Sequence, residues 1–148
     1  MHWGEEYKTE SSRAQKQLAH EIIDAGADLI IGHHPHVVQE YEKYKDKMIF
    51  YSLGNFIFDQ YFSEETQQGL AVRLEIYGSK IIYRVFPIES IVSQPRLMEK
   101  EKAKELITLT AMKNVEGKVA GILGTVIIHL VAGILFMSFK LHSLNTEP

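Results

Sequence analysis

The sequence contains no cysteine, which excludes disulfide bonds and thiolate metal sites. It has only four prolines and one tryptophan among 148 residues. Basic residues are not in excess either, and the formal net charge of −3 argues against non-specific nucleic-acid binding, which requires a basic surface. The polar stretch 1–13 lacks the apolar centre of a secretory signal peptide, so no such signal is predicted there. The length suits one ordinary domain.

Charged residues are absent from one long segment near the C-terminus. Residues 119–139 form a run of 21 residues without Asp, Glu, Lys or Arg. As an α-helix this run would extend about 31 Å, which matches a hydrocarbon core of roughly 30 Å. Lys118 and Lys140 flank it, and their side chains can reach the two membrane interfaces. This length, without a polar face, predicts a single transmembrane helix; the alternative is a buried core helix.

Small residues recur at the start of that predicted helix. Gly117, Gly121 and Thr125 lie four residues apart, a spacing that allows two helices to pack closely. Helix-mediated self-association is therefore one expected contact. Several lysines precede the segment and only Lys140 follows it, so the positive-inside tendency would put the globular part in the cytoplasm.

The most informative residues that are present form the motif Gly32-His33-His34-Pro35-His36. The motif directly follows the apolar run 27–31, which is typical of a strand buried on both faces. Open α/β sheets place their ligands at the ends of such strands. His34 and His36 in an extended loop can point into one cavity, and neutral imidazole binds zinc, iron, manganese or nickel. The motif predicts a metal site; a surface loop whose histidines only cap backbone groups is the alternative.

The segment before this strand has the pattern of an amphipathic helix. Ser12 and Gln15 fit a capping box, and Gly26 fits a C-terminal stop after Ala25. The apolar stripe of this helix is expected to consist of Ala14, Leu18, Ile22 and Ala25. His20 falls on the opposite side and is interpreted as a surface residue.

The remaining patterns predict an α/β fold. After the strand at 27–31, residues 37–38 continue as strand, residues 40–47 read as a charged connection, and residues 48–53 form the next strand. Residues 70–77 and 81–85 alternate in polarity around a turn at 78–79 and predict a hairpin that Pro87 closes. A charged helix is expected over 97–112, with Leu106, Leu109 and Met112 on its apolar side.

Gly54 and Asn55 interrupt the apolar run that follows. A tight turn or bulge explains both residues, since glycine accepts unusual backbone conformations and asparagine tolerates a left-handed one. The functional alternative is that Asn55, with Asp59, faces the histidine site.

Three ordered motifs carry a resemblance to a known family: His2-Trp3-Gly4-Glu5-Glu6-Tyr7, the histidine motif 32–36, and residues 50–58, Phe-Tyr-Ser-Leu-Gly-Asn-Phe-Ile-Phe. Together they resemble the bacterial capsule-synthesis CapA family, also described as poly-gamma-glutamate biosynthesis proteins. That family is similar to the calcineurin-like metallophosphoesterases. The resemblance covers about residues 1–93 and implies the C-terminal part of a metallophosphoesterase-like βαββ sandwich, with the hairpin in its second layer.

The resemblance also implies site residues. Laid on the metallophosphoesterase pattern, His34 and His36 are the expected metal ligands, and His2 occupies the position of an earlier ligand. His33 falls on a glycine of that pattern. Glu6 matches the family's His-Trp-Gly-x-Glu-Tyr pattern and would orient a ligand or bind substrate, although it could equally be a solvated turn residue. His33, Glu6 and Asn55 are thus candidates for a supporting or substrate-binding role. The expected metal is divalent Mn, Fe or Zn.

The family's two-metal centre is completed by residues from the first half of the domain, which this sequence does not contain. We therefore expect a truncated form that is inactive as an enzyme by itself. The expected division is a partial CapA-like domain at 1–93, a charged helical linker at 94–118, the transmembrane helix at 119–139 and a polar tail at 140–148.

The resemblance implies a role in capsule or poly-gamma-glutamate synthesis at the cell membrane. The expected partners are the membrane and other capsule-synthesis membrane proteins, with no nucleic acid. A role in the synthesis of an extracellular polymer implies that the globular part lies outside the cell. The positive-inside tendency predicts the opposite side of the membrane. The orientation of the chain is therefore left open. Two alternatives remain: a metal-dependent phosphoester hydrolase completed by a missing N-terminal half, and a non-catalytic membrane-anchored remnant or binding module.

Overall fold

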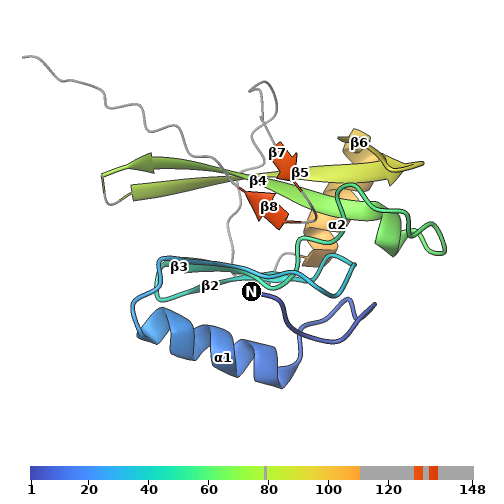
Figure 1. Ribbon diagram of the computed structural model, residues 1–148. Helices are drawn as coiled ribbons and strands as arrows, with labels where there is room; N and C mark the ends of the chain where they lie inside the picture. Colours follow the sequence, from blue (N-terminus) through green and yellow to red (C-terminus); the bar gives the residue numbers. More distant parts are fainter. Residues whose placement is uncertain (79, 111–128, 132–133, 137–148) are drawn as a thin grey trace, which may run out of the picture.

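The computed structural model describes residues 1–78, 80–110, 129–131 and 134–136 (Figure 1). The elements are α1 (Arg13–Asp24), β1 (Leu29–Ile31), β2 (Tyr41–Tyr44), β3 (Lys47–Phe50), the short 3₁₀ helix η1 (Glu65–Gln67), β4 (Gln68–Tyr77), β5 (Lys80–Ile91), β6 (Gln94–Leu97), α2 (Lys100–Thr110), β7 (His129–Val131) and β8 (Ile134–Phe136). In this part of the chain, two three-stranded sheets and two α-helices confirm a mixed α/β fold.

Helix α1 begins with the predicted capping box. The Ser12 hydroxyl accepts a hydrogen bond from the Gln15 backbone N–H at 3.2 Å, and the Gln15 side chain accepts one from the Ser12 N–H at 2.9 Å. Two backbone donors that the first helical turn would leave unpaired are thereby satisfied.

The predicted buried stripe of α1 is wrong by about one position. The buried residues are Gln15, Ala19 and Ile23, whereas Ala14, Leu18 and Ala25 are exposed and Ile22 is half-buried. The reason is a polar residue in the interface: the Gln15 amide donates to the Gln39 side chain at 2.9 Å, so the helix turns this side inward. A pattern based on apolar residues alone therefore selects the neighbouring face.

The first sheet has the strand order β1-β3-β2. Strand β1 pairs in parallel with β3, as its continuous apolar sequence predicted, and β2 pairs with β3 in antiparallel fashion. Residues 40–47, predicted to be a connection, in fact contain β2 and a two-residue turn. Lys45 and Asp46 both have positive φ, +46° and +64°, as tight hairpin turns require. The turn was missed because Lys-Asp lacks the glycine that usually marks such turns.

The second sheet has the order β4-β5-β6 and contains the predicted hairpin. Pro87 does not close the hairpin, contrary to prediction, because β5 continues through it to Ile91. Leu70, its cross-strand neighbour, donates its N–H away from β5 to the Leu53 carbonyl, 2.8 Å away. The pair therefore needs no ladder bond from proline, which has no N–H to give. Residues 94–97, expected to begin the linker, are strand β6 of this sheet.

The elements stack as a helix and two sheets (Figure 1). Helix α1 covers one face of the first sheet and the second sheet lies over the other face. The core between α1 and the first sheet contains Trp3, Ala19, Ile23, Ile30, Ile49 and Tyr51. The core between the two sheets contains Tyr41, Met48 and Phe50, packed against Val72, Tyr83 and Val85. Side chains on both faces of β3 are thus buried, which fixes the edge of the sheet where the histidine motif begins.

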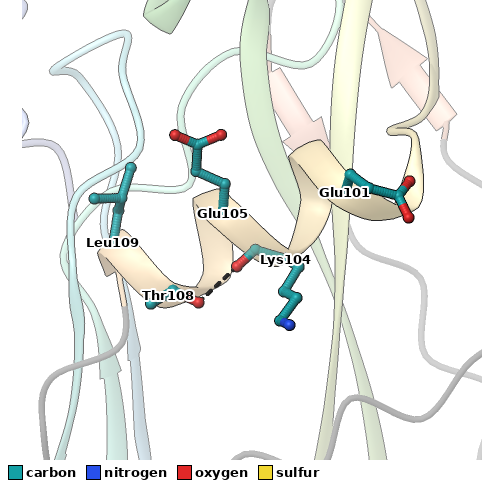
Figure 2. A pocket seen from close by; sticks show the side chains of 5 residues that line it. All are labelled: Glu101, Lys104, Glu105, Thr108 and Leu109. Atoms are coloured by element: carbon teal, nitrogen blue, oxygen red, sulfur yellow. Dashed lines mark hydrogen bonds between the residues drawn. The ribbon is translucent and has the colours of Figure 1, made fainter.

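Helix α2 begins at Lys100 rather than at residue 97, because Leu97 ends β6, and Met112 of the predicted range lies outside the described residues. Leu106 is buried as expected, but Leu109 is 74% exposed. Leu109 lies on the outer face of α2 beside a shallow hollow that is also lined by Glu101, Lys104, Glu105 and Thr108 (Figure 2).

The predicted transmembrane segment 119–139 lies mostly outside the described residues. Its described parts, β7 and β8, pair in antiparallel fashion rather than as helix. Short apolar runs rich in Val, Ile and Leu suit a strand as well as a helix, so sequence alone does not separate the two. Within the described ranges, no helix is long and apolar enough to cross a membrane.

Candidate metal centre

The N-terminal residues run beside the end of β1 and bring His2 to the histidine motif. The Met1 amino group donates to the Ile31 carbonyl at 2.6 Å, His33 N–H to Met1 O at 2.8 Å, and Trp3 N–H to His33 O at 3.2 Å. These bonds place the rings of His2 and His34 with their centroids 4.4 Å apart. Two segments separated by 30 residues therefore form one wall of the site.

Trp3 packs beneath the site rather than facing it. Its indole N–H donates to the Tyr51 carbonyl at 2.8 Å, and its ring stacks on the Tyr51 ring at a centroid distance of 5.9 Å. Both side chains are buried. A Cβ atom at Gly32 would collide with the Tyr51 carbonyl and the Trp3 indole. Glycine at this position therefore allows the strand end, the indole and β3 to meet.

The segment after Trp3 folds over the histidine motif and is held there by a buried amide. Tyr7 N–H donates to the Pro35 carbonyl at 2.8 Å. The Gln39 side chain is 1% exposed and donates to the carbonyls of Lys8 and Glu10, at 2.8 and 3.2 Å. It also accepts the bond from Gln15 described above. These bonds fix the backbone that follows Glu6, and the Trp3 bond to the His33 carbonyl fixes the backbone that precedes it.

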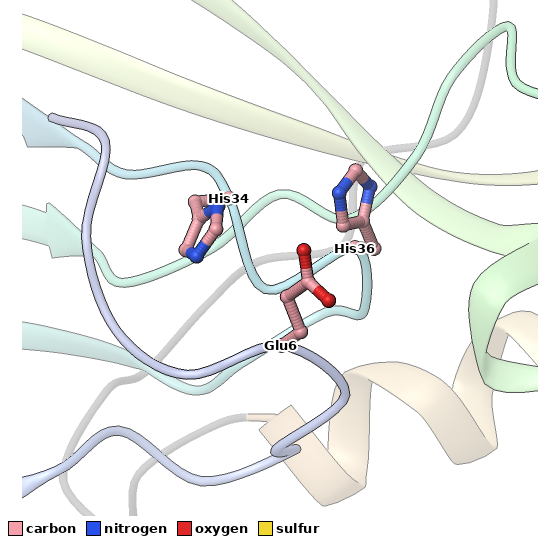
Figure 3. A group of neighbouring side chains, drawn as sticks. All are labelled: Glu6, His34 and His36. Carbon is pink, nitrogen blue, oxygen red and sulfur yellow. The ribbon is translucent and has the colours of Figure 1, made fainter.

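The side chains of Glu6, His34 and His36 lie close together after the end of β1 (Figure 3). One potential ligand atom from each lies within 4.8 Å of the others; Glu6 is exposed and the two histidines are half-buried. His34 and His36 have positive φ, +101° and +60°. Non-glycine residues adopt such angles at a cost of about 1–3 kcal/mol, and this kind of strain clusters at functional sites.

The buried side chain of Asn55 contacts the His36 ring. Its Oδ1 lies 3.0 Å from His36 Nδ1, and its Nδ2 donates to Thr66 O at 2.9 Å and to Gln60 Oε1 at 3.2 Å. The rings of Phe58 and Tyr7 also lie beside the His36 ring, with centroids 4.9 and 6.1 Å away. Gly54 has φ +71°, so the predicted turn and the contact with the histidine site coexist. Asp59, proposed as its companion, is exposed.

The other histidines of the region have separate environments. His33 contributes backbone bonds to the N-terminal segment and is not part of the Glu6–His34–His36 group. Burial, then the charges of the N-terminal ammonium group and of His2, hold the pKa of His33 below its usual value. His20 is half-buried on α1, 2.6 Å from a Glu42 oxygen and stacked on Tyr44. It contacts the first sheet rather than only solvent.

Sequence reasoning missed the amides that hold the site together. Gln15, Gln39 and Gln60 each bond to a partner between 5 and 53 positions away. The one available signal was Gln39, a polar residue directly after the apolar pair 37–38. The distances between the candidate ligands could not be obtained from spacing, because Glu6 reaches the histidines only through this fold.

Residues 1–60, which contain the whole site, match the family described as bacterial capsule synthesis protein PGA_cap. The chain is 61% identical over 59 residues to the capsule biosynthesis protein CapA of Bacillus anthracis. It is 41% identical over 105 residues to the PGA biosynthesis protein CapA of Bacillus subtilis. These matches span 40% and 70% of this chain but only 14% and 27% of the relatives. The chain is thus a partial match to the PGA_cap (CapA) family of bacterial capsule synthesis proteins, carried by residues 1–60.

Proposed function

We propose that this chain acts in the synthesis of capsule or poly-gamma-glutamate, and that Glu6, His34 and His36 hold a divalent metal ion needed for that role. The convergence of these three side chains within the family-matched segment is the observation that carries the proposal. The names of the two CapA relatives supply the polymer class.

The donor set suits a metal of the Mn, Fe or Zn group. Two imidazoles and one carboxylate combine a borderline nitrogen donor with a hard oxygen donor, which these divalent ions accept. Three protein ligands leave a position open for water or substrate, and His2, beside His34, is available as a further donor. Such a metal, when bound, would supply a polarising centre for a phosphoryl or carbonyl oxygen and lower the pKa of bound water. Glu6 would contribute charge and His34 and His36 would set the position of the ion.

A phosphoester hydrolase completed by a separate N-terminal half remains the second candidate. It is favoured by the position of the cluster at the end of β1, which pairs in parallel with β3, and by the second sheet packed on the first. Both features fit the metallophosphoesterase-like sandwich that the motifs imply.

Membrane attachment is part of the proposal. The uncharged run 119–139 would anchor the chain once through the cell membrane, with 1–93 as the partial domain and 94–118 as the connection. Other capsule-synthesis membrane proteins and a second copy of the helix are its proposed partners. Recovery of the chain in the membrane fraction after alkaline washing, lost on deletion of 119–139, would support the anchor.

The functional test exchanges the matched segment. Residues 1–60 would replace the corresponding segment of the Bacillus subtilis CapA protein in a strain that lacks the native gene, and released poly-gamma-glutamate would be measured. The exchange is expected to restore polymer, and His34→Ala or His36→Ala in the same protein to lower it at least tenfold. His20→Ala is the matched control, because His20 lies on α1 in contact with Glu42. Polymer at control levels in the His34 and His36 variants would refute the role of the cluster.

A further inference from the structure

We propose that Asn55 is a positioning residue that holds the neutral His36 ring with its proton on Nδ1, so that Nε2 is the nitrogen available to a metal. One part of this proposal, the use of Nε2 as a metal ligand, rests on the proposed metal-binding function. The proton position itself is a property of the metal-free chain.

The backbone carbonyl of Thr66 determines which end of the Asn55 side-chain amide is the NH₂ group. A carbonyl oxygen only accepts hydrogen bonds, and it lies 2.9 Å from one end of the Asn55 side-chain amide. That end must therefore be the NH₂ group. The same NH₂ group lies 3.2 Å from Gln60 Oε1, which accepts its second hydrogen. Both amide hydrogens are used, and the orientation of the Asn55 side chain follows from its surroundings rather than from a choice between two equivalent flips.

The opposite end of the amide must then be the oxygen. This oxygen lies 3.0 Å from His36 Nδ1 and can only accept. A favourable contact requires His36 Nδ1 to carry the hydrogen, which in the neutral ring leaves a lone pair on Nε2. Metal-binding histidines commonly use one nitrogen for the metal and donate the other N–H to a neighbouring oxygen, which fixes the ring and its tautomer.

The Asn55 side of this contact is buried, whereas the His36 side is half-buried. Asn55 is 7% exposed and Thr66 is 2% exposed, so water competes little for these bonds. The rings of Phe58 and Tyr7, 41% and 42% exposed, lie beside the imidazole. Gln60 extends the network because its own NH₂ group donates to the Tyr7 hydroxyl at 3.1 Å. A single backbone carbonyl thus determines the direction of every hydrogen bond from Thr66 to Tyr7.

The direct test is the tautomer of His36 in the metal-free, detergent-solubilised chain. Long-range ¹H–¹⁵N correlation spectra would be recorded at about pH 8, above the ordinary histidine pKa of ~6.5. In the wild type His36 is expected to show the Nδ1–H pattern. In Asn55→Leu, which removes the acceptor at similar size, the Nε2–H form should appear. An Nε2–H pattern in the wild type would overturn the proposal, even if Asn55→Leu failed to fold.

The second readout is the affinity for Zn²⁺ by titration. Loss of a partner behind a metal ligand typically weakens metal binding 10–100-fold, which is the change expected for Asn55→Leu. Thr110→Val is the matched control: Thr110 is 5% exposed, its hydroxyl donates to the Leu106 carbonyl at 2.8 Å within α2, and it is not among the residues in contact with His36. It should lower stability yet keep the Nδ1–H pattern and an affinity within about threefold of wild type.

The two proposals fail in different ways. If the wild-type chain bound no Zn²⁺ but showed the Nδ1–H pattern that Asn55→Leu removes, the metal site would be refuted and the role of Asn55 would stand. If Zn²⁺ bound tightly and Asn55→Leu left both the tautomer and the affinity unchanged, the role of Asn55 would be refuted and the metal site would stand.

Discussion

The chain contains two regions that use polar side chains differently. In residues 1–60, buried amides and hydroxyls pair across long sequence distances: Gln15 with Gln39, Gln39 with the backbone of residues 8 and 10, and Ser52 with Val37. Both regions carry exposed ion pairs, such as Lys45–Asp24 in the first and Arg96–Glu89 in residues 68–110, but the buried side-chain bond of the described residues 68–110 joins Thr110 to Leu106, within one turn of α2. The buried Ser90 hydroxyl is the only buried side-chain polar atom without a partner in the described part of the chain, and it lies in this second region.

The first region positions the side chains of the site, whereas the second region supports the first sheet. A buried hydrogen bond has few competing geometries, because breaking it leaves an unpaired group out of contact with water. Exposed ion pairs exchange readily with solvent and contribute little. The first region therefore holds Glu6, His34 and His36 in fixed relation, and the second region mainly covers the other face of the first sheet. The family match falls on the first region.

The largest loss of stability is expected from adding a methyl group at Gly32, where the Tyr51 carbonyl and the Trp3 indole are close to the backbone. Gly32→Ala would drive a Cβ atom into the Tyr51 carbonyl and the Trp3 indole, and neither can move without disrupting the core. We expect a loss of more than about 3 kcal/mol in the free energy of unfolding, measured by urea denaturation.

Gly78→Ala in the β4–β5 turn is the matched control for this prediction. Gly78 has φ +58° but open space around it, so only the backbone penalty of about 1–2 kcal/mol applies. Equal losses for the two variants would contradict the close packing described around Gly32.

The next effect concerns the buried amide of Gln39. Gln39→Leu keeps the side-chain size but leaves the Gln15 NH₂ group and the Lys8 carbonyl without their partner. We expect a loss of about 2–3 kcal/mol in unfolding free energy and weaker metal binding, because the backbone around Glu6 is released. Arg96→Ala, which removes an exposed pair with Glu89, should change stability by less than about 0.5 kcal/mol. Similar losses in the two variants would erase the contrast between the regions.

A smaller effect should appear as pH dependence at Glu40. Burial alone would raise the pKa of Glu40, but hydrogen bonds from the Ser11 hydroxyl and N–H and from Lys16 outweigh it and hold the pKa below the usual 4.5. The unfolded chain then binds more protons than the folded one as the pH falls through this range. The stabilisation is therefore complete above the ordinary pKa and is lost below it.

Glu40→Gln tests this directly. The stability difference between wild type and Glu40→Gln should be largest near neutral pH and shrink as the pH falls below about 4.5 toward the lowered pKa. The pH series would be followed by thermal unfolding. A difference that stayed constant, or grew, on acidification would show that the carboxylate charge of Glu40 does not stabilise the fold.

The sequence predicted the parts of the fold that depend on local chemistry. The capping box at Ser12, the parallel strand before the histidine motif and the hairpin after η1 follow from short-range patterns, and the structure contains all three. The buried face of α1 and the strand β2 were wrong because they depend on partners elsewhere: Gln39 for the helix, and β3 for a strand joined by a Lys-Asp turn. Propensity does not contain such information.

The candidate site, like the fold, was predicted from the sequence only in part. The prediction that His34 and His36 share one site is confirmed, but its premise of an extended loop was wrong, because both residues have positive φ. The motifs added His2, Glu6 and Asn55 through a family resemblance. Spacing could not show that Glu6 lies among the histidines while His2 only borders His34, since this depends on how residues 4–11 fold over the turn. Thr66 and Gln60, which orient Asn55, carry no sequence signal at all.

Metal content of the detergent-solubilised chain is the measurement that tests the central claim most directly. Elemental analysis after loading with Mn²⁺, Fe²⁺ or Zn²⁺ and removal of excess metal would compare wild type with His34→Ala, His36→Ala and Glu6→Gln, and with His20→Ala as control. The cluster predicts about one equivalent per chain in the wild type and the control, and a loss of at least tenfold in affinity in each of the three variants. Absence of bound metal in the wild type, or equal metal in all five proteins, would contradict the assignment of Glu6, His34 and His36 as a metal centre.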